Sequence, residues 1–235
     1  MLIVSRRSGG EPAIFHSVQG EGVSLGVPSV FLRLATCNLA CSWCDTKYTW
    51  DWQNFNYQTE VVELGPEIVQ QKIQAYDCSH VVITGGEPML QQEELQPMVE
   101  SLADEGYTFE VETNGTIPPT PGMLRHIGQW NVSPKLRTSG NQLLETQNPL
   151  ALQTFAALPD AYFKFVIAVE SDVDEVCTLR DQYDLAPQRI LLMPEGRTPD
   201  ALARKSAWLP GLCVQHGFRF TTRLHIILWG DERGR

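Results

Sequence analysis

The chain has 235 residues, a length that allows one or two domains and also fits a single α/β barrel. Apolar residues make up 43% and charged residues 20% of the sequence, a composition that excludes a disordered chain. The formal net charge of −10 argues against bulk electrostatic binding to nucleic acid or to an anionic membrane. No apolar run reaches the roughly 18 residues of a spanning helix, and the start of the chain lacks an export signal. We therefore expect a cytoplasmic protein that binds neither nucleic acid nor a membrane.

Strand-like and helix-like segments alternate along most of the chain. Seven segments are predicted as strands, at 30–35, 80–84, 107–111, 130–132, 162–168, 189–193 and 219–222. Four are predicted as helices, at 66–76, around 95–102, at 171–183 with Ser171 as N-cap, and at 199–207. In the first of these helices one apolar face is expected from Ile68, Val69, Ile73 and Tyr76.

Alternating strands and helices predict a mainly parallel sheet that is covered on both faces. Because only seven strands are expected and several are short, the pattern favours an incomplete TIM-like βα barrel over a closed eight-stranded one. Segments 51–65 and 136–160 fit the pattern poorly and are interpreted as insertions or ordered loops within one domain that spans residues 1–235.

Unusual polar and glycine residues follow the ends of these predicted strands. They are a cysteine loop, Gly85 with Gly86, Glu112 with Asn114, Ser133 with Lys135, and Glu195. The carboxyl ends of the strands form the rim on which βα barrels build their active sites. The sequence therefore predicts a functional site on this rim.

The cysteine loop contains three of the six cysteines, Cys37, Cys41 and Cys44, in a C-x3-C-x2-C arrangement. Clustered thiols in a chain without an export signal indicate a reducing compartment and a metal centre rather than a disulfide framework. A structural zinc site would need a fourth ligand from a distant His or Cys. A [4Fe–4S] cluster held by three thiolates would instead keep one iron open for another ligand.

On this spacing, the chain resembles the radical S-adenosylmethionine superfamily, with Gly85-Gly86-Glu87-Pro88 as the second matching segment. The resemblance implies a radical SAM barrel in which Cys37, Cys41 and Cys44 hold the [4Fe–4S] cluster. It also implies that S-adenosylmethionine binds to the open iron. The residues that it assigns to S-adenosylmethionine are Trp43, Asp45, Gly86, Glu87, Ser133, Pro134, Lys135, Met193, Pro194, Glu195 and Gly196.

A narrower resemblance, to the 7-carboxy-7-deazaguanine synthases, runs from about residue 14 to residue 229. It is carried by Gln19–Gly22, Cys37–Thr46, Thr84–Pro88, Glu112–Gly115 and Ser133–Lys135. That family converts 6-carboxy-5,6,7,8-tetrahydropterin to 7-carboxy-7-deazaguanine with loss of ammonia, in queuosine and 7-deazapurine biosynthesis. The resemblance further implies Mg²⁺, a homodimer, and an electron donor such as flavodoxin or ferredoxin.

The same resemblance assigns Thr46 to magnesium and a further group of residues to the pterin. These are Val18, Gln19, Gly20, Glu21, Arg33, Thr84 and His225. Arg33 can also be argued from the residues alone, because a guanidinium among apolar neighbours needs an anionic partner and matches a carboxylate bidentately. The alternative for Arg33 is a buried structural salt bridge. Either Glu21 or Glu112 could accept from the edge of the pterin ring, and both could be structural.

Two other functions stay open on the sequence. A glycyl-radical-activating enzyme shares the cysteine spacing but acts on a partner protein, whereas Gln19–Gly22 and Arg33 favour a small carboxylated substrate. A non-catalytic zinc or iron–sulfur binding module would use the same cysteines without turnover. Metal analysis separates this module from the enzyme, because zinc alone favours the module and iron with labile sulfide favours the enzyme.

Overall fold

A computed structural model describes all residues from Met1 to Arg235. The strands are β1 (Leu2–Ser5), β2 (Ile14–Val18), β3 (Pro28–Leu34), β4 (Val61–Leu64), β5 (His80–Gly85), β6 (Thr108–Thr113), β7 (Gln129–Val132), β8 (Ala161–Ile167), β9 (Ile190–Pro194) and β10 (Arg219–Phe220). The helices are α1 (Tyr57–Glu60), α2 (Pro66–Gln74), α3 (Gln92–Asp104), α4 (Pro121–His126), α5 (Leu143–Thr146), α6 (Pro149–Ala157), α7 (Asp172–Tyr183), α8 (Pro199–Ser206), α9 (Leu209–His216) and α10 (Leu224–Trp229). Short 3-10 helices are η1 (Lys47–Thr49), η2 (Pro88–Gln91), η3 (Arg137–Ser139) and η4 (Pro187–Arg189).

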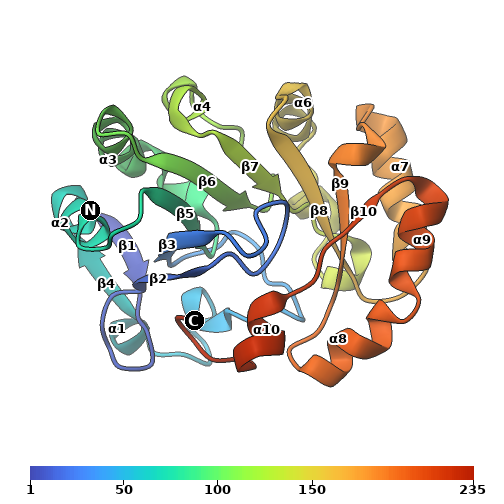
Figure 1. Cartoon of the computed structure of the whole chain (residues 1–235), viewed down its shortest axis with the longest axis horizontal. Coiled ribbons are helices and arrows are strands. Elements are labelled where there is room, and N and C mark those ends of the chain that lie inside the picture. Colours follow the sequence, from blue (N-terminus) through green and yellow to red (C-terminus); the bar gives the residue numbers. More distant parts are fainter.

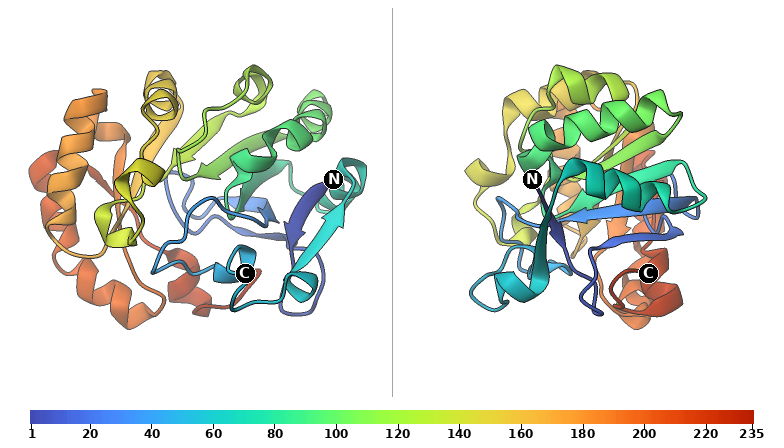
Figure 2. Two further views of the ribbon diagram at one scale, coloured as in Figure 1. Left: turned by 180° about the vertical axis from the view of Figure 1, so that it is seen from behind. Right: turned by 90° about the vertical axis from the view of Figure 1, so that its left-hand side faces the viewer.

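All ten strands belong to one curved sheet in the order β10-β9-β8-β7-β6-β5-β3-β1-β4, with β2 paired to β3. The seven strands from β3 and β5 through β10 are parallel, whereas β1, β2 and β4 pair antiparallel. The sheet curves around a central space, with most helices on its outer side, and its two edges do not meet (Figure 1, Figure 2). The predicted incomplete βα barrel is confirmed. No helix in the structure combines the length and the apolar composition that a membrane-spanning helix requires.

The strands and outer helices enclose a single large apolar core of 39 buried residues, which holds the strand ends in fixed positions. In α3 the buried face is Leu95, Met98, Val99 and Leu102, as the spacing predicts. In α2 only Val69 and Ile73 are buried, and Ile68 is 44% exposed. The buried face of this helix is therefore narrower than the apolar face predicted from the sequence.

Other parts differ from the sequence prediction. Ser171 precedes α7 but its hydroxyl makes no capping hydrogen bond; instead, the Asp172 carboxylate accepts from the amides of Ala168 and Val169 at 2.7 and 3.1 Å. Segment 51–65 contains α1 and β4, and β4 extends the sheet beyond β1. Segment 136–160 contains α6, which connects the parallel strands β7 and β8 as a regular crossover helix.

The loop between β2 and β3, residues 19–27, crosses the space inside the sheet and becomes the floor of the site (Figure 1). Its contacts reach strands far along the chain. The Gly22 amide donates to Thr221 Oγ1 at 3.0 Å, and Gln129 Nε2 donates to Ser24 Oγ at 2.8 Å. The loop is thereby fixed to β7 and to the residue that follows β10.

Candidate active site

A cavity of about 450 Å³ lies inside the sheet, above the 19–27 loop and beneath the cysteine loop. Most residues predicted for the site line it. These are Val18, Gln19, Gly20, Glu21, Arg33, Cys37, Cys41, Trp43, Cys44, Asp45, Thr46, Thr84, Gly86, Ser133, Lys135, Met193, Glu195 and His225. Glu87, Pro134, Pro194 and Gly196 are the four predicted residues that do not line it.

The cysteine loop presents three free thiols to this cavity. Asn141 Nδ2 donates to Cys41 Sγ at 3.2 Å, and Trp50 Nε1 donates to Cys44 Sγ at 3.4 Å. Burial raises the pKa of Cys37 to about 12 and also raises the pKa of Cys41, so both are thiols until a cation stabilises the thiolate. N–H donors aimed at sulfur are the groups that tune iron–sulfur clusters.

The donor set fits an iron–sulfur cluster better than a single ion. No three His, Cys, Asp or Glu side chains converge as the ligands of one metal ion would. Three thiols on one short loop suit a cluster, in which each thiolate binds a different iron. Lys135 adds a positive charge nearby, with its Nζ donating to Ser133 Oγ at 2.8 Å and lying 5.7 Å from the Trp43 ring.

Gly85 and Gly86 hold the base of the cysteine loop. A Cβ on Gly85 would lie 2.2 Å from the Leu34 carbonyl oxygen, and a Cβ on Gly86 would lie 1.8 Å from the Thr36 carbonyl oxygen. The Gly86 amide donates to Leu34 O at 3.1 Å, and the Glu87 amide donates to Thr36 O at 2.8 Å. The double glycine is therefore required by the close approach of two backbones immediately before Cys37.

Glu87, predicted to contact S-adenosylmethionine, does not line the cavity in this structure. Glu87 is fully buried, and burial raises the pKa of its carboxyl group. Its oxygens accept from Thr113 Oγ1 at 2.7 Å and from the amides of Asn114 and Met89 at 2.7 and 3.0 Å. The turn at Gly85–Gly86 directs this side chain behind the cavity, where it joins the ends of β5 and β6.

The last predicted cofactor segment, residues 193–196, also has two residues that line the cavity and two that do not. Met193 and Glu195 line the cavity, and Glu195 is paired with Lys205 at 2.9 Å. Pro194 ends β9 and is buried, and the Gly196 carbonyl accepts from Arg223 Nη1 at 2.8 Å outside the lining. Pro134 is likewise buried behind Ser133 and Lys135.

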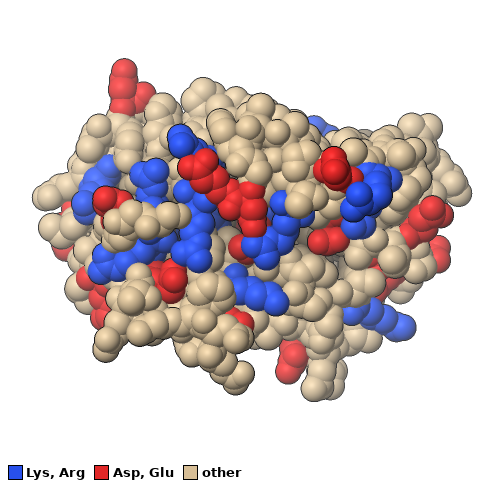
Figure 3. Space-filling model, turned by 90° about the horizontal axis from the view of Figure 1, so that it is seen from below, with Lys and Arg blue, Asp and Glu red and all other residues tan.

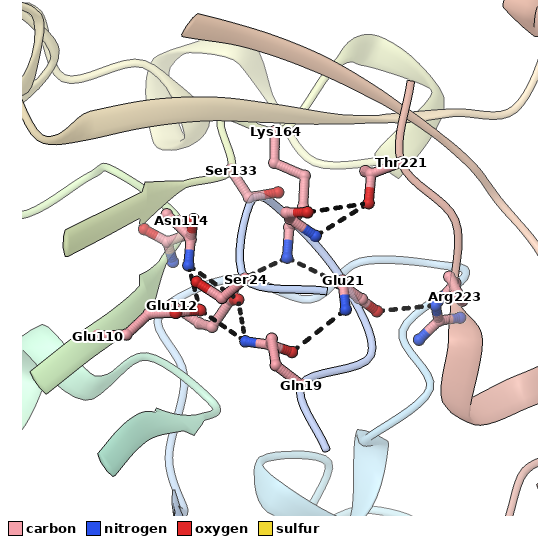
Figure 4. Close-up of polar contacts among 12 residues, drawn as sticks. Gln19, Glu21, Ser24, Glu110, Glu112, Asn114, Ser133, Lys164, Thr221 and Arg223 are labelled. Atoms are coloured by element: carbon pink, nitrogen blue, oxygen red, sulfur yellow. Dashed lines mark hydrogen bonds and ion pairs between the residues drawn. The ribbon is translucent and has the colours of Figure 1, made fainter. Parts of the chain in front are cut away.

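The floor of the cavity carries a connected set of charged and amide side chains (Figure 4). Lys164 Nζ, on β8, lies 2.6 Å from Glu112 Oε2 and 2.7 Å from Glu21 Oε2. Gln19 Nε2 donates to Glu110 Oε1 at 2.6 Å and to Glu112 Oε1 at 3.2 Å, and Asn131 Nδ2 donates to the same two oxygens. Glu110 and Glu112 are two residues apart on β6, so both face the inside of the barrel.

Arg223 extends this set to the cysteine loop. Its Nε donates to Glu21 Oε1 at 3.0 Å, and its Nη2 pairs with Asp45 Oδ2. Although burial opposes ionisation, Lys164 and Arg223 hold the pKa of Glu21 below its ordinary value, and Arg223 does the same for Asp45. Asp45, predicted to meet the cofactor, is therefore committed to an ion pair.

Arg33 and His225 complete the predicted substrate side. Arg33 makes no ion pair, unlike Lys164 and Arg223 in the same cavity, so a structural salt bridge does not explain it. His225 packs so closely on Gly20 that a Cβ there would lie 2.2 Å from His225 Nδ1. Burial lowers the pKa of His225, so its imidazole is neutral near pH 7.

Sequence reasoning missed Lys164, Arg223, Glu110 and Asn131. A signal existed for Lys164, because a charged residue between Phe163 and Phe165 on a buried strand has the same anomaly that singled out Arg33.

The chain end was also missed: residues 230–235 line the cavity, with Arg233 lying 3.6 Å from the Tyr48 ring centroid.

Cations gather at this site although the chain is acidic overall. Eight of the 18 Lys and Arg residues line the cavity, namely Arg33, Lys47, Lys135, Lys164, Arg197, Arg223, Arg233 and Arg235. Figure 3 shows Lys and Arg side chains concentrated across the face on which α10 and the chain end lie. The cavity therefore suits an anionic ligand.

Comparison with known proteins agrees with this geometry. Residues 33–133 match the model of the radical SAM superfamily. The chain is 41% identical to a 7-carboxy-7-deazaguanine synthase of Pyrobaculum aerophilum over 94% of this chain and 95% of that protein, and 35% identical to one of Halobacterium salinarum over 93% and 89%. It also resembles the crystal structure of QueE from Escherichia coli, with a TM-score of 0.67, 27% identity and 95% of each chain covered.

Proposed function

Because the chain belongs to the 7-carboxy-7-deazaguanine synthase family of radical S-adenosylmethionine enzymes, we propose that its cavity catalyses the reaction of that family. The reaction is the ring contraction of 6-carboxy-5,6,7,8-tetrahydropterin to 7-carboxy-7-deazaguanine with loss of ammonia, and the enzyme is a lyase of queuosine biosynthesis. The observation that carries the proposal is that an unpaired Arg33 and three free thiols open into one cavity.

Cys37, Cys41 and Cys44 hold the [4Fe–4S] cluster, and Gly86, Ser133, Lys135 and Met193 face the place of S-adenosylmethionine. When bound, this cofactor pair supplies the radical that abstracts a hydrogen atom from the substrate. The chain's own part is to bind the cofactor and to orient the substrate. Lys135 places a fixed positive charge beside the cofactor, and the buried Glu87 fixes the turn that carries Gly86.

Arg33 binds the substrate carboxylate, because a half-buried guanidinium without an ion-pair partner is matched by a bidentate anion. Thr84 is its register partner on β5 and so faces the same bound molecule. Backbone groups of Val18–Gly20, with Glu21 or Glu112, accept from the donor edge of the pterin, and the neutral His225 completes this wall. Together these groups fix the orientation of the substrate, so that one of its C–H bonds faces the cofactor. The contribution of the protein to the rate is this orientation.

Magnesium binding at Thr46, a homodimer, a cytoplasmic location and an electron donor such as flavodoxin or ferredoxin belong to the same proposal. Thr46 Oγ1 offers a hard oxygen ligand at the cavity wall, 3.6 Å from Cys44 Sγ. Neither a glycyl-radical-activating enzyme nor a non-catalytic module is favoured, because the relatives that match nearly the whole chain are 7-carboxy-7-deazaguanine synthases.

The test is anaerobic turnover. Reconstituted protein is incubated with a low-potential reductant, S-adenosylmethionine, Mg²⁺ and 6-carboxy-5,6,7,8-tetrahydropterin, and 7-carboxy-7-deazaguanine and ammonia are quantified. We expect the two products in equal amounts, with S-adenosylmethionine not consumed in proportion. If the reconstituted protein contains a full cluster and cleaves S-adenosylmethionine but leaves the pterin unchanged, the proposed substrate is wrong.

A further inference from the structure

We propose that Lys164 is a positioning residue for the substrate, which holds the Glu21 and Glu112 carboxylates together as acceptors on the floor of the cavity. The inference rests on the proposed function and assigns a task to a residue that neither contacts the cofactor segments nor belongs to the sequence motifs. Lys164 comes from β8, Glu112 from β6 and Glu21 from the 19–27 loop. One ammonium group thus joins three separate parts of the chain.

Lys164 has no partners except these two carboxylates. Its side chain is 4% exposed, and its two charged contacts, at 2.6 and 2.7 Å, are short enough to be strong hydrogen bonds. A buried lysine is costly unless it is paired, and one carboxylate would already neutralise it. The second carboxylate therefore calls for a reason beyond the stability of Lys164.

The acceptor capacity of the two glutamates provides that reason. Glu112 Oε1 accepts from both Gln19 and Asn131, whereas Glu112 Oε2 accepts from Lys164 alone. Glu21 accepts one hydrogen bond at each oxygen, from Lys164 and from Arg223. Since a carboxylate oxygen takes about two hydrogen bonds, both residues keep free acceptor positions, and both line the cavity.

A pterin presents a row of N–H donors along its amino-pyrimidinone edge, which two neighbouring ionised carboxylates can receive. A protonated carboxyl group would instead place an O–H against one of these donors. The charged groups around Lys164 work in opposite directions: Glu21, Glu110, Glu112 and Asp45 are acidic, Arg223 and Arg33 are basic, and His80 and His225 stand beside Glu110 and Glu21. The four carboxylates outnumber Lys164 and Arg223, the two cations that pair with Glu21, Glu112 and Asp45, so the charge of Lys164 favours the ionised form of both Glu21 and Glu112.

The protonation equilibrium supports this geometry. Burial, together with the charges of Glu110 and Glu21, raises the pKa of Glu112 to about 7 against the opposing effect of Lys164. Loss of Lys164 would raise the pKa of Glu112 further. Glu112, which is partly ionised at pH 7 in the wild type, would then be protonated at that pH and would ionise only at higher pH.

The experiment compares Lys164→Met, Lys164→Arg, Glu112→Gln and the double variant Lys164→Met/Glu112→Gln, with exposed Lys72→Met on α2 as the matched control. KM for the pterin and kcat are measured from pH 6 to 9.5, beside iron content and the EPR change on adding S-adenosylmethionine. For Lys164→Met we expect KM at pH 7 to rise about tenfold or more, with recovery at high pH and unchanged cluster signals. Lys164→Arg, which keeps the charge, should retain the wild-type pH midpoint.

In the Glu112→Gln background the Lys164→Met change should raise KM much less than it does in the wild type, because the two residues act through one contact. An unchanged KM and pH profile in Lys164→Met, with only a lower melting temperature, would mean that Lys164 is structural. An equal KM penalty in both backgrounds would also overturn the inference. If Lys164→Met does not fold, a shifted pH midpoint in Lys164→Arg overturns it, and an unshifted one supports it. Failure of the wild type to convert the pterin would instead defeat the proposed function.

Discussion

Arg33 on β3 and Thr84 on β5 are register partners on adjacent parallel strands, and both side chains line the cavity beneath the cysteine loop. Neighbouring positions in register point to the same face of a sheet, so the guanidinium and the hydroxyl address one bound molecule. Arg33 is the cation of this pair and has no carboxylate partner of its own.

We predict that Arg33→Ala raises KM for the carboxylated pterin by roughly 30-fold to several thousand-fold, since truncating one partner of a desolvated charge pair costs about 2–5 kcal/mol. Arg33→Lys keeps the charge but loses the planar fork, so its KM should lie between those of Arg33→Ala and the wild type. Steady-state kinetics at equal cluster content checks both. A folded Arg33→Ala enzyme with the KM of the wild type would rule out carboxylate binding at this position.

The cysteines divide into two sets with different expected behaviour. Cys37→Ala, Cys41→Ala and Cys44→Ala should each lose most of the iron and all turnover, because each removes one of three cluster ligands. Cys78→Ala, Cys177→Ala and Cys213→Ala are the matched controls, since these thiols lie outside the cavity and bond only to backbone carbonyls or His216. Iron and labile sulfide analysis after anaerobic reconstitution checks the division. Full iron in any of the first three variants would contradict the assignment.

Substitution of Glu87 tests whether its carboxylate stabilises the fold or contacts S-adenosylmethionine. Glu87→Ala leaves the Thr113 hydroxyl and the Asn114 amide buried without an acceptor, and each such group costs about 1–3 kcal/mol. For a chain of this size we expect the melting temperature to fall by roughly 5–15 °C. Affinity for S-adenosylmethionine, measured on the folded variant at low temperature, should change little. An unchanged melting temperature with a large loss of affinity would instead support direct contact between Glu87 and S-adenosylmethionine.

The regular part of the fold was accessible to sequence reasoning for a physical reason. The parallel strands β5 and β9 are buried on both faces and therefore read as short apolar runs, Val81–Ile83 and Ile190–Leu192. The edge strand β4 and the strand β2, which pairs with β3 alone, lack that signal because they are partly exposed, whereas β1 is buried but offers only the short apolar run Leu2–Val4. Helix α6 was missed because it is apolar on most sides and has no clear amphipathic period.

Residue types with a strong local signature can be read from the sequence, whereas a position that depends on a distant partner cannot. The cysteine spacing and the double glycine are visible in the sequence. The position of Glu87 is not, because the direction of its side chain is fixed by β6, 26 residues away at Thr113. Arg223 meets Asp45 and Glu21 across 178 and 202 residues of sequence, so its pairing follows only from the curvature of the sheet, which brings these segments together.

The chain end is expected to be held mainly by Arg233. Arg233 Nη1 pairs with Glu60 Oε2 at 2.7 Å, and its guanidinium lies 3.6 Å from the centroid of the Tyr48 ring. Arg233→Ala should therefore speed hydrogen exchange of the 226–235 amides by roughly 5- to 30-fold, the effect of about 1–2 kcal/mol. Arg197→Ala is the control, because the Arg197–Asp231 pair is about half exposed and such pairs contribute little. Equal exchange rates in the two variants would show that Arg233 does not anchor this segment.

The final prediction concerns Thr46 and magnesium. Thr46 follows the third cysteine by two residues, its Oγ1 lies 3.6 Å from Cys44 Sγ, and it faces the cavity in which cofactor and substrate must meet. A hard cation held there would grip substrate oxygens and fix the position of the reacting C–H bond, and a misplacement of about 1 Å can cost roughly 100-fold in rate. We expect Thr46→Ala to keep its iron and its binding of S-adenosylmethionine but to lose most of the stimulation by Mg²⁺. Thr46→Ser, which retains the hydroxyl, should be affected less. The measurement is a Mg²⁺ titration of turnover for the wild type and both variants at equal cluster content, and superimposable curves would place the metal at another residue.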